Sequence, residues 1–127
     1  MENIHDFIGY HLIANYSGCN IESLTNLDNL RDALNSAIVA SGASVLSSNE
    51  YIFDGNGFSM VFLLSESHAS IHTYPEVNSC FIDIFTCGTE CSPEKFAIVI
   101  EEYLQPENSS RKMLIRDIGI ENVETLF

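Results

Sequence analysis

The spacing of apolar residues predicts two amphipathic helices in this chain. The first is expected over residues 23–41, where the apolar positions fall at helical intervals: Leu27, Leu30, Leu34, Ala37 and Ile38. Gly42 follows directly and is typical of a helix end. The second helix is expected over residues 92–104, because Ser92 can cap it and Pro93 suits its first position. Its apolar stripe comprises Phe96, Val99, Ile100, Tyr103 and Leu104.

Shorter apolar or alternating segments predict six strands. They lie at residues 9–18, 43–53, 58–64, 68–74, 80–88 and 111–119. Residues 54–57, Asp-Gly-Asn-Gly, have the composition of a tight turn. Residues 58–64 are apolar at nearly every position, as expected of a strand that is covered on both faces. Alternation in 68–74 places one set of side chains on the same face: His68, Ser70, His72 and Tyr74.

The order of these elements, β-α-β-β-β-β-α-β, predicts an α+β fold. We expect a two-layer sandwich in which a mainly antiparallel sheet carries its helices on one face. The length of 127 residues is enough for one domain, residues 1–127, with a single core. The second face of such a sheet is open, so it must be covered by a partner or carry the functional site.

Composition and charge narrow the possible partners. The net charge of −13 argues against nucleic acid and anionic membrane, because both require a cationic surface. No apolar run approaches the ~20 residues that span a bilayer. The first ten residues are acidic and lack the pattern of a signal peptide, so a cytoplasmic location is expected. The four cysteines are too few and too scattered for a disulfide scaffold, which favours free thiols.

The candidate chemistry is concentrated in "LLSESHASIHTYPE", residues 63–76. His68, His72 and Glu76 recur every four residues, which on a helix would align three metal ligands. The segment alternates as a strand does, and Pro75 opposes a helix through Glu76. Adding the C-x₃-C pair of Cys87 and Cys91 gives only an irregular ligand set, so we expect no metal site.

Proton-transfer chemistry is a second interpretation of the same region. Ser67, His72 and Cys87 are expected on two neighbouring strands and near one another, and they supply a hydroxyl, an imidazole and a thiol. A Ser/His hydrolase is disfavoured because the G-x-S-x-G motif is missing. Taken singly, each residue also fits an ordinary structural role, such as Cys87 in the core.

Two motifs resemble a known family. "SESHASIHTYPE", followed by "DIFTCG", closely resembles the small prokaryotic type of S-adenosylmethionine decarboxylase, a pyruvoyl enzyme of spermidine synthesis. The resemblance extends from "GYHLIA" to about Leu104. It implies self-cleavage between Glu66 and Ser67, giving chains 1–66 and 67–127, with a pyruvoyl group formed from Ser67. That group forms a Schiff base with the substrate amine and accepts electrons as CO₂ leaves.

The resemblance also implies roles for individual residues. His72 corresponds to the residue that moves protons during self-cleavage, and Ser59 to a serine that assists it. Cys87 corresponds to the thiol that reprotonates the product. The working unit implied is a homodimer of processed protomers with sites near the subunit interface.

Substrate recognition is implied by three further positions. Phe53 and Tyr74 match the two rings that sandwich adenine in the family, and Glu76 matches the carboxylate that holds the ribose hydroxyls. Core packing is the alternative for the two rings. The family's F-x-P-x-G-V-S-G is "FDGNGFSM" here, so Gly55 and Met60 depart from it and are expected to reshape the pocket wall. Decarboxylation of ornithine or arginine, and an inactive regulatory paralogue, remain alternatives.

Overall fold

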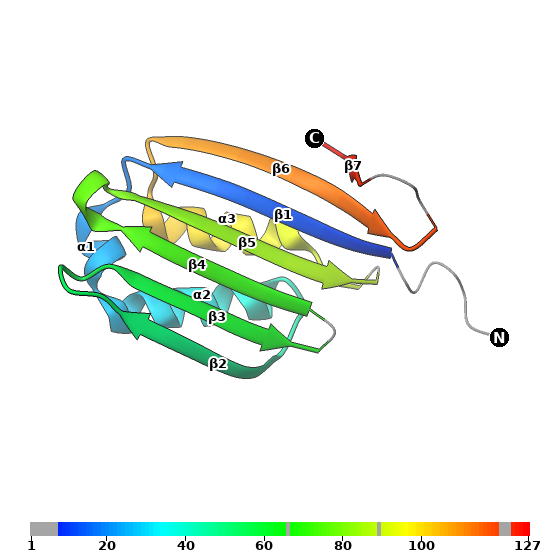
Figure 1. Cartoon of the computed structure of the whole chain (residues 1–127), viewed down its shortest axis with the longest axis horizontal. Helices are drawn as coiled ribbons and strands as arrows, with labels where there is room; N and C mark the ends of the chain where they lie inside the picture. Colours follow the sequence, from blue (N-terminus) through cyan, green and yellow to red (C-terminus); the bar gives the residue numbers. More distant parts are fainter. Residues whose placement is uncertain (1–7, 66, 89, 120–122) are drawn as a thin grey trace.

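The structure, a computed structural model, describes residues 8–65, 67–88, 90–119 and 123–127 (Figure 1). Its elements along the chain are β1 (Ile8–Ser17), α1 (Ile21–Thr25), α2 (Leu27–Ala40), β2 (Val45–Ile52), β3 (Phe58–Leu64), β4 (Ser67–Tyr74), the 3₁₀ turn η2 (Pro75–Val77), β5 (Ser79–Cys87), α3 (Pro93–Leu104), β6 (Asn108–Asp117) and β7 (Glu124–Thr125). All six predicted strands form. None of the helices in these ranges is both long and apolar enough to cross a bilayer.

The strands form one antiparallel sheet in the order β2-β3-β4-β5-β1-β6-β7. Helices α2 and α3 lie side by side behind this sheet (Figure 1). The predicted two-layer α+β fold is therefore confirmed. The short strand β7 was not predicted, because two residues carry no recognisable alternation.

The helix expected over residues 23–41 is in fact two helices with a break at Asn26. The Asn26 side chain accepts a hydrogen bond from the backbone N–H of Asn29 and so caps α2. Asn20 caps α1 in the same way through the N–H of Ser23. Asparagine competes for backbone hydrogen bonds in this manner, which is why it favours helix starts over helix interiors.

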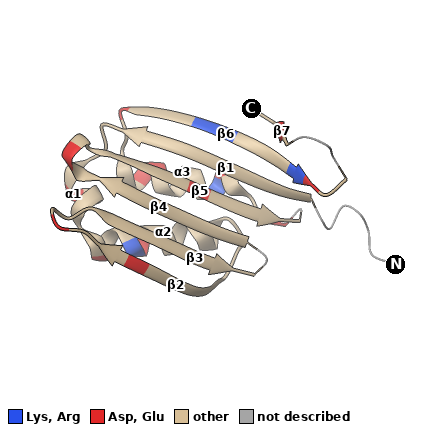
Figure 2. Cartoon of the chain, in the orientation of Figure 1, with Lys and Arg blue, Asp and Glu red and all other residues tan. Residues whose placement is uncertain are grey.

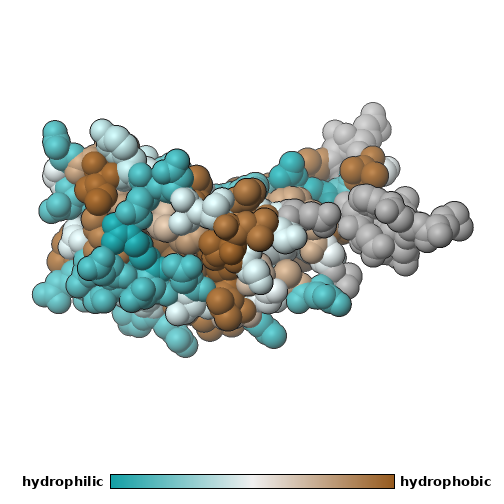
Figure 3. Space-filling view, turned by 90° about the horizontal axis from the view of Figure 1, so that it is seen from below, coloured by the Kyte–Doolittle hydropathy of each residue, from teal (hydrophilic) through white to brown (hydrophobic). Residues whose placement is uncertain are grey.

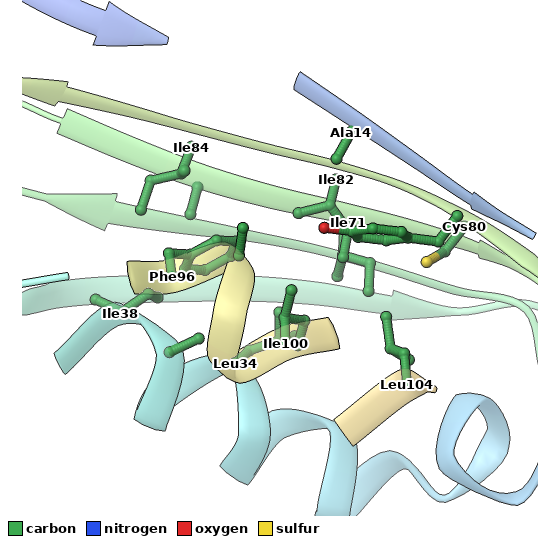
Figure 4. Close-up of a cluster of buried hydrophobic side chains, with 14 of the residues drawn as sticks. Ala14, Leu34, Ile38, Ile71, Cys80, Ile82, Ile84, Phe96, Ile100 and Leu104 are labelled. Carbon is green, nitrogen blue, oxygen red and sulfur yellow. The ribbon is translucent and has the colours of Figure 1, made fainter. Parts of the chain in front are cut away.

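The core lies between the two helices and the covered face of the sheet (Figure 4). Helix residues meet strand residues there: Leu34, Ile38, Phe96, Ile100 and Leu104 pack near Ile71, Ile82 and Ile84, all of them at most 5% exposed. Arg31 links α2 to edge strand β2, because its Nε and Nη2 donate to the Glu50 carboxylate at 2.6 and 2.5 Å.

The other face of the sheet is open and mixes apolar with polar side chains. Four large side chains on it are well exposed: Ile13 (39%), Val61 (51%), Leu63 (56%) and Phe81 (50%). The expectation that residues 58–64 are covered on both faces is therefore wrong for the single chain, because alternate residues of β3 face outward. Strands β1, β3, β4 and β5 contain one charged residue, Asp83 (Figure 2).

The edge formed by β2 is also partly apolar. A view onto this edge shows apolar surface among hydrophilic side chains (Figure 3). On β2 the exposed apolar side chains are Leu46 (63%), Tyr51 (64%) and Ile52 (48%).

Candidate active site

A pocket of about 540 Å³ opens where the β2–β3 turn meets the end of β4. It is lined by Phe53, Asp54, Gly57, Ser59, His72, Thr73, Tyr74 and Glu76. All three positions expected to bind substrate, and two of those expected to assist self-cleavage, therefore line one pocket. Two aromatic rings with a few polar groups are the usual lining of a small-molecule site.

The turn between β2 and β3 holds Phe53 at the pocket mouth. The Phe53 N–H donates to the Gly57 carbonyl at 2.7 Å, and the Asn56 N–H donates to the Phe53 carbonyl at 3.2 Å. Gly55 and Asn56 have φ of 85° and 68°, which glycine and asparagine adopt readily. The predicted turn at 54–57 is confirmed. Met60 is 5% exposed and belongs to the core, so it does not reshape the pocket wall as we expected.

Ser59 and His72 form a hydrogen-bonded pair in the pocket. They lie directly opposite each other on β3 and β4, and Ser59 Oγ is 2.8 Å from His72 Nδ1. A contact at Nδ1 orients the ring and leaves Nε2 as the nitrogen that can exchange a proton with another group. This arrangement suits the assisting roles that the sequence implied for both residues.

Ser67 and Cys87 meet at the opposite end of β4. Ser67 is the first residue of β4 and is 9% exposed. Its Oγ accepts a hydrogen bond from the Cys87 backbone N–H at 3.3 Å. The Cys87 side chain is half-buried and points to the open face. Glu66 lies outside the described residues.

The expected cluster of Ser67, His72 and Cys87 is thus only partly present in one chain. Ser67 and Cys87 are in contact, but Ser67 and His72 are five positions apart along an extended strand. At about 3.3 Å per residue, their backbones are roughly 16 Å apart. Ser67 and Cys87 therefore occupy one end of β4, whereas His72, Ser59 and the residues proposed for substrate recognition occupy the other.

A polar cluster that was not predicted lies between these two ends. His11 Nε2 is 2.6 Å and His68 Nε2 is 3.3 Å from the same carboxylate oxygen of Asp83. Ser70 Oγ donates to the other oxygen. Partial burial acts to raise the pKa of Asp83, but hydrogen bonds from His11 and Ser70 outweigh it, so this pKa lies below its usual value.

His11, His68 and Asp83 could together hold a metal ion, since their ligand atoms lie within 4.8 Å of one another. The guanidinium of Arg116 disfavours this use. The Arg116 guanidinium lies 3.5 Å from His11 Nδ1 and can donate a hydrogen bond to it. In that tautomer His11 Nε2 carries the ring proton and donates it to Asp83, so Nε2 has no lone pair for a metal ion. The cluster is better described as a satisfied hydrogen-bond network.

The metal set that the sequence suggested does not assemble. His68 contacts Asp83 and His72 contacts Ser59, while Glu76 lies on η2. Both histidines point to the same face, but they are four positions apart along the strand, which separates them by about 13 Å. His11 could not have been linked to Asp83 from sequence, because they are 72 residues apart and meet only through the β5–β1 pairing.

Comparisons with known proteins identify the family of this chain. The family model described as S-adenosylmethionine decarboxylase matches residues 10–117. A Bacillus cereus protein named S-adenosylmethionine decarboxylase proenzyme 2 is 41% identical over 111 residues, covering 87% of this chain and 90% of the relative. An S-adenosylmethionine decarboxylase proenzyme from Oceanobacillus iheyensis is 34% identical over 121 residues, covering 95% and 96%.

A solved structure gives the same result for the fold. The crystal structure of the adenosylmethionine decarboxylase from Aquifex aeolicus matches with a TM-score of 0.80 and 28% identity, covering 92% of this chain and 97% of that one. The chain belongs to the S-adenosylmethionine decarboxylase family. The resemblance found in the sequence is confirmed, and with it the class: a carboxy-lyase made as a proenzyme, with a self-generated pyruvoyl cofactor.

Proposed function

We propose that this chain cleaves itself between Glu66 and Ser67 and then decarboxylates S-adenosylmethionine, giving the aminopropyl donor for spermidine synthesis. The observation that carries this proposal is the pocket in which Phe53, Tyr74 and Glu76 converge. Two half-exposed rings offer flat apolar faces to adenine. The carboxylate of Glu76 can accept hydrogen bonds from ribose hydroxyls.

Self-cleavage uses the chain's own serine as nucleophile. The Ser67 hydroxyl attacks the carbonyl carbon of Glu66, and the peptide C–N bond breaks, so that an ester replaces the amide. Loss of the α-proton of residue 67 and β-elimination of the Glu66 carboxylate give dehydroalanine, which water converts to a pyruvoyl group and ammonia. A serine hydroxyl is a weak nucleophile without a nearby base. We assign proton transfer in these steps to His72, which Ser59 orients through Nδ1.

We assign that base to a second copy of the chain. His72 and Ser67 are separated by about 16 Å within one chain, far beyond the ~3 Å reach of proton transfer. Two copies related by a two-fold axis near the middle of β4 would bring Ser67 and Cys87 of each copy to the pocket of the other. Contacts across such an axis are reciprocal, so two equivalent sites result.

The open sheet face supports this dimer. Its centre carries exposed apolar side chains, among them Val61, Leu63 and Phe81, which a single chain leaves in water. One charged residue, Asp83, lies in the four strands β1, β3, β4 and β5, and its carboxylate is already hydrogen-bonded. Arg116 of β6 also reaches this face, where its guanidinium lies over the Phe85 ring and 3.5 Å from His11 Nδ1. Few charged groups therefore have to be desolvated when a second copy covers these four strands.

The residues around Ser67 fit the family's cofactor. Thr86 Oγ1 is buried and has no hydrogen-bond partner within the described ranges, so a hydroxyl donor remains for a new carbonyl oxygen near Cys87. The pyruvoyl carbonyl, once formed, supplies an electron sink for the bond that releases CO₂. Cys87 then delivers a proton from its thiol. Phe53, Tyr74 and Glu76 hold the nucleoside, which fixes the substrate's position relative to that thiol.

The cytoplasm is the proposed location. Cys19, Cys80 and Cys91 are thiols, and Cys19 and Cys80 are buried within hydrogen-bonding reach of each other without a disulfide. Adjacent thiols of this kind persist in a reducing compartment.

A basic amino acid is a second candidate substrate, because Asp54 adds another carboxylate to the pocket. Purified protein should be incubated with carboxyl-labelled S-adenosylmethionine, ornithine and arginine, and released CO₂ measured. The proposal expects S-adenosylmethionine to be preferred, two fragments of 66 and 61 residues on a denaturing gel, and a dimer by light scattering. Ser67→Ala should stay whole and inactive. An uncleaved Ser67→Ala protein with full activity would contradict the mechanism, and preference for arginine or ornithine would contradict the substrate.

A further inference from the structure

Each of the two pocket rings packs against a second aromatic ring that lies outside the pocket. The ring centroids of Tyr51 and Phe53 are 4.7 Å apart, with an angle of 60° between the ring planes. Those of Phe81 and Tyr74 are 5.4 Å apart at 62°. Both pairs have the separation and tilt of favourable aromatic contacts. Neither Tyr51 nor Phe81 lines the pocket itself.

These two outer rings occupy one row across the sheet. Tyr51 lies directly opposite Ser59, Ser59 opposite His72, and His72 opposite Phe81. The row therefore has an aromatic residue at each end and the hydrogen-bonded Ser59–His72 pair between them. Directly opposed side chains have Cβ atoms about 5 Å apart, so each outer ring borders this pair.

Phe53 and Tyr74 have little other support on their exposed sides. Phe53 follows edge strand β2 and is 51% exposed, and Tyr74 ends β4 and is 40% exposed. A ring with free rotamers loses that freedom when a ligand stacks on it, which weakens binding. A neighbouring ring that restricts the rotamers beforehand lowers this loss.

We propose that Tyr51 and Phe81 are positioning residues that hold Phe53 and Tyr74 at the spacing an adenine ring requires. This inference rests on the proposed function and adds a determinant of nucleoside affinity to it. Neither Tyr51 nor Phe81 lines the pocket, and each contacts a ring that does, so we expect them to act on substrate binding. Their effect should appear in Kd and KM while kcat at saturating substrate is unchanged.

The test measures binding of methylthioadenosine, an uncharged adenine nucleoside, by calorimetry, and KM and kcat for S-adenosylmethionine. Tyr51→Ala and Phe81→Ala should each raise Kd and KM roughly two- to tenfold, the value of one aromatic pair. Tyr51→Phe should bind as wild type does, because the contact is made by the ring. Leu46→Ala (63% exposed) is a matched control on β2 and should leave Kd unchanged. Leu63→Ala (56% exposed) measures the effect of disturbing the open face alone, and should change Kd less than Phe81→Ala does.

Folding is checked by thermal melting, and all four replaced side chains are well exposed. Wild-type affinity in Tyr51→Ala and Phe81→Ala would overturn the inference. An equal loss in Leu63→Ala and Phe81→Ala would also overturn it, because the effect would then come from covering the open face. Either of these two outcomes leaves the proposed function intact if the wild-type protein binds methylthioadenosine and decarboxylates S-adenosylmethionine. If the wild-type protein does neither, the proposed function and this inference are both overturned.

Discussion

Phe53→Ala tests how the pocket recognises its ligand. The ring is 51% exposed, so about half of its surface is available to a bound nucleoside. An aromatic side chain contributes about 150–250 Å² of burial, which leaves about 100 Å² for the ligand to cover. At ~25 cal/mol per Å² this is up to about 2.5 kcal/mol, within the ~1–3 kcal/mol found for base–aromatic stacking.

We therefore expect Phe53→Ala to weaken methylthioadenosine binding roughly ten- to hundredfold, with kcat/KM for S-adenosylmethionine falling by a similar factor. Self-cleavage should continue, because the ring takes no part in proton transfer. Ile98→Ala is a suitable control, since Ile98 is 55% exposed on α3. A change in kcat/KM of less than about twofold, which corresponds to less than ~0.5 kcal/mol, would refute the stacking argument.

Three further substitutions test the chemistry and the polar groups. Cys87→Ala should still be cleaved, but turnover should fall by ~10²–10⁴, the usual value of a lost general acid, and normal turnover would remove the thiol from the mechanism. Glu76→Gln should weaken S-adenosylmethionine binding by roughly tenfold or more, as expected when hydrogen bonds to a charged acceptor are weakened, and an unchanged KM would contradict its role. The pKa of Asp83 is lowered in the folded state by its hydrogen bonds with His11 and Ser70. These bonds therefore stabilise the protein at a pH above the ordinary carboxyl pKa, and the stabilisation is lost as the pH falls through the lowered pKa. The stability difference between wild type and Asp83→Asn, from chemical denaturation, should thus be largest near neutrality and shrink below about pH 4, whereas a constant difference would be inconsistent with this linkage.

The features predicted correctly depend on local pattern. Alternation in residues 68–74 places the side chains of His68 and His72 on one face of the sheet, as the structure does. The turn at residues 54–57 follows from its glycines and asparagine. Each of these depends on a few consecutive residues, which is why the sequence is sufficient.

The features missed depend on the sheet as a whole. Ser67 and His72 are close in sequence, but an extended strand moves them apart, so proximity along the chain suggested a shared location that one copy does not provide. The contact of His11 with Asp83 requires β1 to lie beside β5, and no local pattern specifies that pairing. The break at Asn26 lies within a segment whose apolar residues keep helical spacing, so the sequence pattern predicted one continuous helix there.

The central claim is that each active site is built from two copies of the chain, and hybrid dimers test it most directly. Phe53→Ala and Cys87→Ala chains carrying different tags are co-expressed, and decarboxylation of S-adenosylmethionine is compared with that of each variant alone. If Cys87 of one copy serves the pocket of the other, each hybrid has one intact site. Random assortment makes half of the dimers hybrids, so about one quarter of wild-type activity should return. Activity no higher than the average of the two separate variants would contradict the shared site and place Cys87 and Phe53 of the same chain in one centre.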